Sequence, residues 1–133
     1  MKYLVLLGRI LYSLIFLFSI GNHFSASGVQ YAASKGVLMP SVLVPLAGVI
    51  AFAGGLSILL GYKARLGAWL LVLFLVPVTL MMHNFWTLTD PMMRSMQRVM
   101  FLKNLSMLGG ALFIAYFGAG PLSLDSRSGI HKS

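Results

Sequence analysis

The segment from His83 to Asn104, HNFWTLTDPMMRSMQRVMFLKN, decides how the chain folds. It lies between two long apolar runs, and Asp90 followed by Pro91 predicts the start of a helix. Asp at a helix N-cap accepts a hydrogen bond from a free backbone N–H, and Pro suits the first helical position. The segment ends with Lys103 and Asn104, which begin the next apolar run. Polar side chains are unfavourable in lipid, so we expect a specific environment to hold them.

The composition of the chain is that of a membrane protein. Of its 133 residues, 59% are hydrophobic and 9% are charged, whereas a soluble domain has about 25% charged residues. The formal net charge of +8 comes from Lys and Arg scattered at the ends of apolar runs, which favours anionic lipid headgroups over nucleic acid as the partner. The sequence has no cysteine, and this excludes thiol redox chemistry, disulfides and cysteine-ligated iron–sulfur clusters.

Four apolar runs predict an all-α integral membrane protein, an antiparallel four-transmembrane-helix bundle. Each run is long enough for a helix to cross the hydrocarbon core of a bilayer. The first run contains Arg9 and is longer than the apolar core of a signal peptide, so we expect it to be retained as an anchor. Residues 21–36 are rich in Gly, Ser and Asn and indicate a loop, and the polar tail is expected to fray. Residues 1–133 are predicted to form one domain, with spans at about 4–21, 38–60, 65–82 and 91–118 and the tail at 119–133.

The distribution of Lys and Arg predicts the orientation. Four spans put both termini on one side of the membrane, and five basic residues lie near the spans on that side: Lys2, Lys63, Arg65, Arg127 and Lys132. The other side has three, which are Lys35, Arg94 and Arg98. The positive-inside rule then places both termini in the cytoplasm.

Two helix faces carry information about packing. Arg9 and Ser13 lie on one polar stripe of the first span, and such stripes normally face other helices. Two interpretations of Arg9 stay open, because its side chain either extends to the inner headgroups or is buried against a structural partner or a ligand. In the second span, Ala47, Ala51 and Gly55 form a small-residue ridge that allows close helix approach, within the bundle or in a homo-oligomer.

Topology gathers polar residues at the outer membrane face. This predicted outer cluster consists of His23, His83, Asn84, Asp90, Lys103 and Asn104. Lys103 either extends to the interface or faces inward, and it faces inward if Arg94, about 180° away on the helical wheel, faces the headgroups. Lys and His can donate hydrogen bonds to quinone oxygens, and His can exchange the proton that accompanies quinone reduction. Two His without a carboxylate make a poor metal site, so the expected cofactor is a quinone and no metal is expected. The predicted cofactor-binding residues are His83, Asn84, Lys103, Asn104, His23 and Arg9.

Several short motifs occur in order along nearly the whole chain. They are Gly8-Arg9-Ile10-Leu11 leading into Phe16-Leu17-Phe18-Ser19 and Gly21; Leu60-Gly61-Tyr62-Lys63-Ala64-Arg65; His83-Asn84-Phe85-Trp86; Phe101-Leu102-Lys103-Asn104-Leu105 with Gly109-Gly110; and Gly118 to Asp125, ending in Leu-Ser-Leu-Asp. Together these motifs resemble the DoxX family of small four-helix membrane proteins. The resemblance implies a protein of the bacterial or archaeal cytoplasmic membrane, and the family takes its name from a subunit associated with thiosulfate:quinone oxidoreductase.

The resemblance extends to individual polar positions. By this resemblance, the polar positions typical of the family are Arg9, His83, Asn84, Lys103 and Asn104. Family members often have a Lys in the region after the glycine that here is Gly21, where this chain has Asn22-His23 instead, so the resemblance assigns no role to His23.

The favoured function is a quinone-binding subunit of a membrane redox system in the bacterial inner membrane, with a membrane or periplasmic redox partner. The alternative is a non-catalytic accessory or assembly protein for a membrane complex. A passage for small solutes or lipids is disfavoured, because no continuous polar path joins Arg9 to the outer cluster. The sequence assigns no catalytic residue. The other expected partners are the lipid bilayer and a second copy of the chain.

Overall fold

The computed structural model describes residues 1–129, which form helices and contain no β-strand. The elements in chain order are α1 (Lys2–Phe18), α2 (Ile20–His23), α3 (Ala26–Ser34), α4 (Pro40–Leu60), α5 (Ala64–Met82), the 3₁₀ turn η1 (Phe85–Thr87), α6 (Pro91–Phe117) and α7 (Leu124–Ser128). Within residues 1–129, four segments are long and apolar enough to cross a membrane: Lys2–His23, Pro40–Leu60, Ala64–Thr87 and Pro91–Phe117. The predicted all-α four-span fold is therefore confirmed, and the chain is a multi-pass membrane protein.

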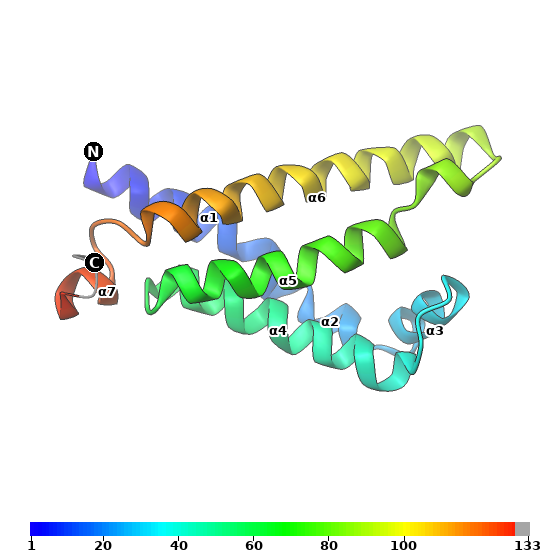
Figure 1. Cartoon of the computed structure of the whole chain (residues 1–133), viewed down its shortest axis with the longest axis horizontal. Coiled ribbons are helices and arrows are strands. Elements are labelled where there is room, and N and C mark those ends of the chain that lie inside the picture. The colour runs from blue at the N-terminus through cyan, green and yellow to red at the C-terminus, as the bar shows by residue number, and fades with distance from the viewer. Residues whose placement is uncertain (130–133) are drawn as a thin grey trace.

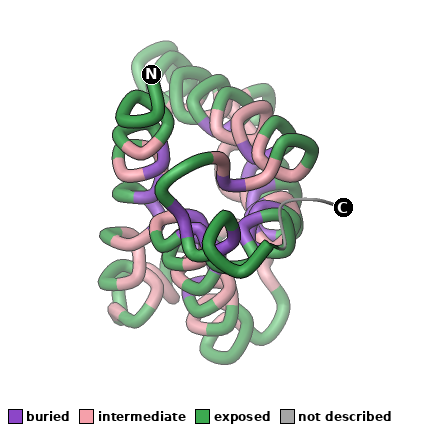
Figure 2. Tube along the Cα trace, turned by 90° about the vertical axis from the view of Figure 1, so that its left-hand side faces the viewer, coloured by how far each residue is buried: buried purple, intermediate pink, exposed green. Residues whose placement is uncertain are grey.

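The hairpin of α4 and α5 forms the centre of the bundle, with α1 packed on α4 and α6 packed on α5. Figure 1 shows α6 as the longest helix, running beside α5, with the start of α1 and α7 at the same end of the bundle. The opposite end, with α3, η1 and the start of α6, is called the distal end below. Figure 2 shows that the buried positions face inward and that the exposed ones cover the outside, as expected for helices surrounded by lipid.

Small residues set the distances between helices. An added Cβ at Gly54 would lie 2.8 Å from a Leu71 methyl group and 2.9 Å from the Gly67 carbonyl oxygen, so only glycine allows α4 and α5 to be this close. A Cβ at Gly55 would lie 2.9 Å from Cβ of Phe16 in α1. Ala51 is also buried. The small-residue ridge of α4 thus packs inside the bundle, as one of its two interpretations required.

The predicted start of α6 is confirmed at atomic level. The Asp90 side chain accepts a hydrogen bond of 3.2 Å from the Met92 backbone N–H, and Pro91 occupies the first turn. The tight turn between α4 and α5 contains Gly61 at φ +66° and Lys63 at φ +49°.

The prediction of a loop over residues 21–36 is wrong, because α2 and α3 occupy most of this segment. Ser25 is extended, and its hydroxyl accepts a hydrogen bond of 3.1 Å from the Gly28 backbone N–H, which makes it an N-cap for α3. The helix ends before Gly36, which has φ +81°. The Ser and Gly content that indicated a loop in fact marks the two ends of a short helix.

The prediction of a fraying tail is wrong for the part of the tail that the structure describes. Ser123 and Ser126 form a capping box that starts α7, and buried Asp125 donates its backbone N–H to the Gly61 carbonyl over 2.8 Å. Residues 130–133, the last part of the predicted tail, lie outside the described residues. The final described segment is therefore packed onto the α4–α5 turn.

Arg9 joins this terminal packing. It is 4% exposed, and its Nη2 donates hydrogen bonds to the backbone carbonyls of Pro121 and Leu122. Of the two interpretations of Arg9, extension to the headgroups is therefore wrong. Its partner is the chain itself, and this lies at the opposite end of the bundle from the predicted outer cluster.

Candidate functional site

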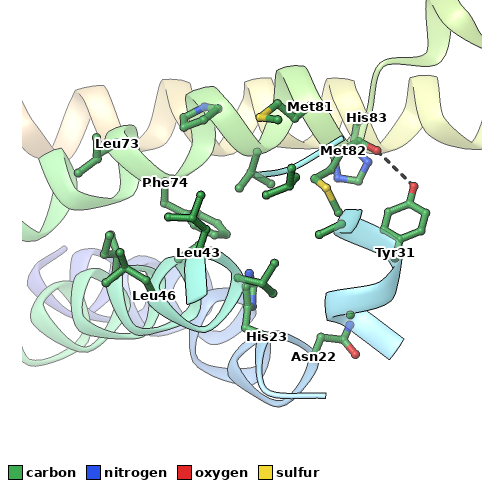
Figure 3. A pocket seen from close by; sticks show the side chains of 18 of the residues that line it. Asn22, His23, Tyr31, Leu43, Leu46, Leu73, Phe74, Met81, Met82 and His83 are labelled. Carbon is green, nitrogen blue, oxygen red and sulfur yellow. Dashed lines mark hydrogen bonds between the residues drawn. The ribbon is translucent and has the colours of Figure 1, made fainter. Parts of the chain in front are cut away.

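A pocket of about 650 Å³ lies at the distal end, between the α2–α3 segment, α4 and α5. Figure 3 shows Leu46 and Leu73 toward one end of it and Tyr31 and His83 toward the other. Leu73 and His83 are separated by about 15 Å along the α5 axis, from the helical rise of 1.5 Å per residue. Leu46 and Leu73 are 50% and 60% exposed, so the apolar end opens toward the lipid-facing surface. The pocket is therefore elongated, with an apolar end and a polar end.

His23 is fixed in the wall of the pocket. Its ring centroid lies 5.5 Å from that of Phe74 on α5, and its Cβ lies against Gly48 of α4, where an added Cβ would be 2.4 Å away. The Nδ1 atom lies 2.9 Å from the Ser19 carbonyl oxygen. Because a carbonyl can only accept, Nδ1 is the donor of this contact.

His83 ends α5 and connects it to α6. Its Nδ1 lies 2.8 Å from Oε1 of Gln97 in the second turn of α6, so Nδ1 is again the donor. The same residue lines the pocket. The polar end of the pocket is thus built on a junction of two membrane-spanning helices.

Two side-chain hydrogen bonds hold α3 against the end of α5. The Tyr31 hydroxyl donates to the Met82 carbonyl over 3.3 Å, drawn as the dashed line in Figure 3. Lys35 Nζ donates to Asn84 Oδ1 over 3.1 Å and lies 5.7 Å from the centroid of the Tyr31 ring. Tyr31, Lys35 and Asn84 are called the rim below. Tyr31 lines the pocket, so the rim lies beside its polar end.

The structure separates the six predicted site residues into three places. His23 and His83 line the pocket, and Asn84 belongs to the rim. Lys103 is exposed on α6 with Nζ 3.4 Å from the Met100 sulfur, so of its two interpretations the inward-facing one is wrong. Asn104 is buried on α6 but does not line this pocket. Arg9 is at the end of the bundle that holds the termini.

Helical periodicity explains why Lys103 was misplaced. The buried residues of α6 are Asn104 and Ala111, which are seven residues apart and therefore lie on one face. Lys103 precedes Asn104 by one residue and so is rotated by about 100°. The sequence argument took the inward face of α6 to be the one opposite Arg94. In the structure Arg94, Arg98 and Lys103 are all exposed, so the position of Arg94 does not identify the inward face.

Sequence reasoning missed Tyr31 and Lys35 as site residues. Both were assigned to a loop, where their spacing has no meaning. Once Ser25 is recognised as an N-cap, the spacing of four residues places them on one helix face. A cap residue before an alanine-containing segment was the signal that could have found them.

The family follows from comparison with known proteins. The SURF4 family model matches residues 1–131. The chain belongs to the SURF4 family. This SURF4-family chain is 32% identical to the inner membrane protein YphA of Escherichia coli (strain K12) over 126 residues, which are 93% of the chain and 89% of that protein. It is 31% identical to the inner membrane protein YqjF of the same organism over 123 residues, or 91% of the chain and 88% of that protein.

Longer members of the SURF4 family occur in fungi. The chain is 30% identical over 129 residues to the ER-derived vesicles protein ERV29 of Saccharomyces cerevisiae, and this region is 97% of the chain but 35% of that protein. The Surfeit locus protein 4 homolog of Schizosaccharomyces pombe is 30% identical over 130 residues, 97% of the chain and 39% of that protein. No solved structure shows a significant match to the chain.

The SURF4 assignment overturns the resemblance to the DoxX family. The quoted motifs consist largely of turn glycines, interfacial aromatic residues and helix ends, which any small bundle of membrane helices needs. The SURF4 assignment also contradicts the predicted function, so the function as a quinone-binding subunit of a redox system and the oxidoreductase activity that the resemblance implied are wrong. The same finding gives no support to an accessory or assembly role. Binding of a quinone, a redox partner and a second copy of the chain stay predictions.

Proposed function

We propose that this SURF4-family chain is a membrane-embedded binding protein that holds the hydrocarbon chain of an amphiphilic ligand in the distal pocket. The observation that carries the proposal is the polarity of the pocket. Its apolar end, at Leu46 and Leu73, opens to the lipid-facing surface, and its polar end is built from Tyr31, His83 and neighbouring polar groups. A volume of about 650 Å³ falls within the range of known small-molecule sites.

The location is part of the same proposal. The names of the Escherichia coli relatives support a bacterial inner membrane, and the positive-inside rule supports cytoplasmic termini. The pocket then lies in the outer half of the membrane. Relatives named for a bacterial inner membrane and for ER-derived vesicles share this unit, which supports a ligand that is available in both kinds of membrane.

Photo-crosslinking in lipid nanodiscs tests the proposal. A single-chain lipid with a diazirine near its methyl end should label the pocket walls, residues 43–50 and 73–82, more than the exposed apolar face of α6 at Leu112 and Phe113. The variant Leu46→Trp narrows the apolar end and should reduce pocket labelling at least about fivefold, since loss of one well-formed apolar contact site is worth about 1 kcal/mol or more.

The matched control is Leu7→Trp. Leu7 is also 50% exposed but lies on α1 and does not line the pocket. Pocket labelling of this variant should therefore equal that of the wild type. Labelling spread evenly over all lipid-facing helices, or unchanged by Leu46→Trp, would show that the pocket binds no chain.

A further inference from the structure

The acidic residues of the chain leave the distal end with excess positive charge. The sequence contains two of them, Asp90 and Asp125. Asp125 lies at the end that holds the start of α1, where its carboxylate accepts hydrogen bonds from the backbone of Lys63 and Ala64. Asp90 is engaged at the start of α6 with the Met92 backbone N–H. The two Asp carboxylates are therefore both engaged by backbone N–H groups, and neither lines the pocket.

Lys35 is a cation beside the polar end of the pocket. It follows α3, whose Tyr31 and Ala32 line the pocket, and it bonds Asn84, the neighbour of the lining residue His83. The side chain is half-buried, and within residues 1–129 no carboxylate forms an ion pair with it. An ammonium group has three donor hydrogens, and the hydrogen bond to Asn84 uses one of them.

The partners of Lys35 hold its ammonium group without neutralising it. Asn84 offers an amide oxygen, and Tyr31 offers the face of its ring at 5.7 Å. Both contacts favour a cation at this place, but neither supplies a negative charge. A partly desolvated cation whose contacts are all uncharged is a favourable partner for an anionic oxygen, because charge-assisted hydrogen bonds are about twice as strong as neutral ones.

We infer that the pocket selects a single-chain amphiphile with an anionic head, of which a long-chain fatty acid is the simplest member, and that Lys35 binds the head while the chain runs along α5 toward Leu46 and Leu73. This inference rests on the proposed function. The elongated pocket accounts for the chain. Lys35 accounts for the head, because it contacts the lining residue Tyr31 and bonds Asn84, the neighbour of the lining residue His83. A volume of about 650 Å³ favours one chain over the two of a diacyl phospholipid.

The experiment uses three diazirine probes with the same acyl chain in nanodiscs made of zwitterionic lipid. One probe is a fatty acid, one is the uncharged monoacylglycerol, and one is phosphatidylglycerol, which is anionic but has two chains. In the wild-type protein the fatty acid should label residues 73–83 at least about fivefold more than the monoacylglycerol, as one charge-assisted contact implies. Lys35→Gln should remove this preference, and Lys35→Arg should retain it.

The matched control is Lys103→Gln, which removes an exposed cation on α6 outside the pocket and should leave the preference unchanged. Equal labelling by the fatty acid and the monoacylglycerol would overturn the anionic head but leave the chain-binding function standing. Pocket labelling by none of the probes would overturn both. Stronger labelling by phosphatidylglycerol than by the fatty acid would overturn the single-chain ligand, and displacement by an apolar peptide but not by excess fatty acid would replace the lipid with a polypeptide.

Discussion

The Asp125 carboxylate accepts a hydrogen bond of 2.7 Å from the backbone N–H of Lys63, which lies 62 residues earlier in the chain. Its other oxygen accepts one of 2.9 Å from the Ala64 N–H. The first N–H groups of a helix have no partner within the helix and carry partial positive charge, so a carboxylate is favoured there. The start of α5 is thus capped by a residue from the end of the described chain, and the docking of α7 is coupled to the folding of the central hairpin.

This coupling predicts a large effect of Asp125→Asn. The substitution removes the charge and leaves one of the two N–H groups facing an amide NH₂ group, so we expect the free energy of unfolding to fall by about 2 kcal/mol. Titration with SDS of the detergent-purified protein measures it. Asp90→Asn is the matched control, since Asn caps an exposed helix start as well as Asp, and it should change stability by less than about 0.5 kcal/mol. Equal losses in the two variants would contradict the coupling.

Gly61 provides a second test of the same junction. An added Cβ would lie 2.2 Å from Arg9 Nη1 and 2.3 Å from Ser123 Cβ, in a residue at φ +66°. Gly36→Ala shares the positive φ, at +81°, but its Cβ would meet nothing within 4 Å. Both variants should lose about 1 kcal/mol from the backbone conformation, and Gly61→Ala should lose about 1–3 kcal/mol more from steric overlap. The same SDS titration compares them, and equal stabilities would show that α7 is not docked there.

Closure of the bundle between α1 and α6 depends on Gly110. The Tyr12 hydroxyl donates to the Met107 carbonyl, and an added Cβ at Gly110 would lie 2.7 Å from Cε2 of Tyr12. We expect Gly110→Ala to separate these helices and to lower the unfolding free energy by about 1–3 kcal/mol. Gly109→Ala adds the same atoms where nothing lies within 4 Å, and its effect should be zero or slightly stabilising, because Ala is the better helix former. A Gly109 effect as large as that of Gly110 would place the α1 contact elsewhere.

Local sequence signals predicted most of the fold but little of the candidate site. Length and hydropathy fixed the four spans, and Asp90-Pro91 fixed the start of α6, because both signals act within one helix. The contacts of Arg9 with residues 121–122 could not be predicted, since nothing local distinguishes a snorkelling arginine from a buried one. That choice is made by tertiary packing.

The candidate site shows the same division. His23 and His83 were assigned to the site because topology alone brings the ends of their helices together. The inward interpretation of Lys103 was wrong because the helical wheel does not show which face of α6 is buried. The buried face carries Asn104 and Ala111 and is not the one opposite the arginines. Lys35 was missed because α3 was not recognised as a helix.

The rim predicts a local opening of the pocket. Tyr31→Phe removes the hydrogen bond to the Met82 carbonyl, and Asn84→Ala removes the one from Lys35. Because these are side-chain bonds at a surface, the double variant should lose about 1–2 kcal/mol of local stability, with amide hydrogen exchange in residues 27–35 about fivefold or more faster. Exchange in α4 and α5 should not change. Tyr62→Phe, at an exposed tyrosine whose ring lies near Lys63, is the control, and unchanged exchange in α3 of the double variant would show that the rim does not hold it.

Orientation can be tested directly because the sequence has no cysteine of its own. Ser95→Cys places a thiol on the exposed first part of α6 at the distal end, and Ser128→Cys places one on α7 at the other end. If the termini are cytoplasmic, as the excess of Lys and Arg at that end predicts, a membrane-impermeant maleimide should label Ser95→Cys in intact cells. Ser128→Cys should be labelled only after the membrane is permeabilised. The reverse pattern would put the pocket in the cytoplasmic half of the membrane, so that the rim and Lys35 would meet ligands from the cytoplasm.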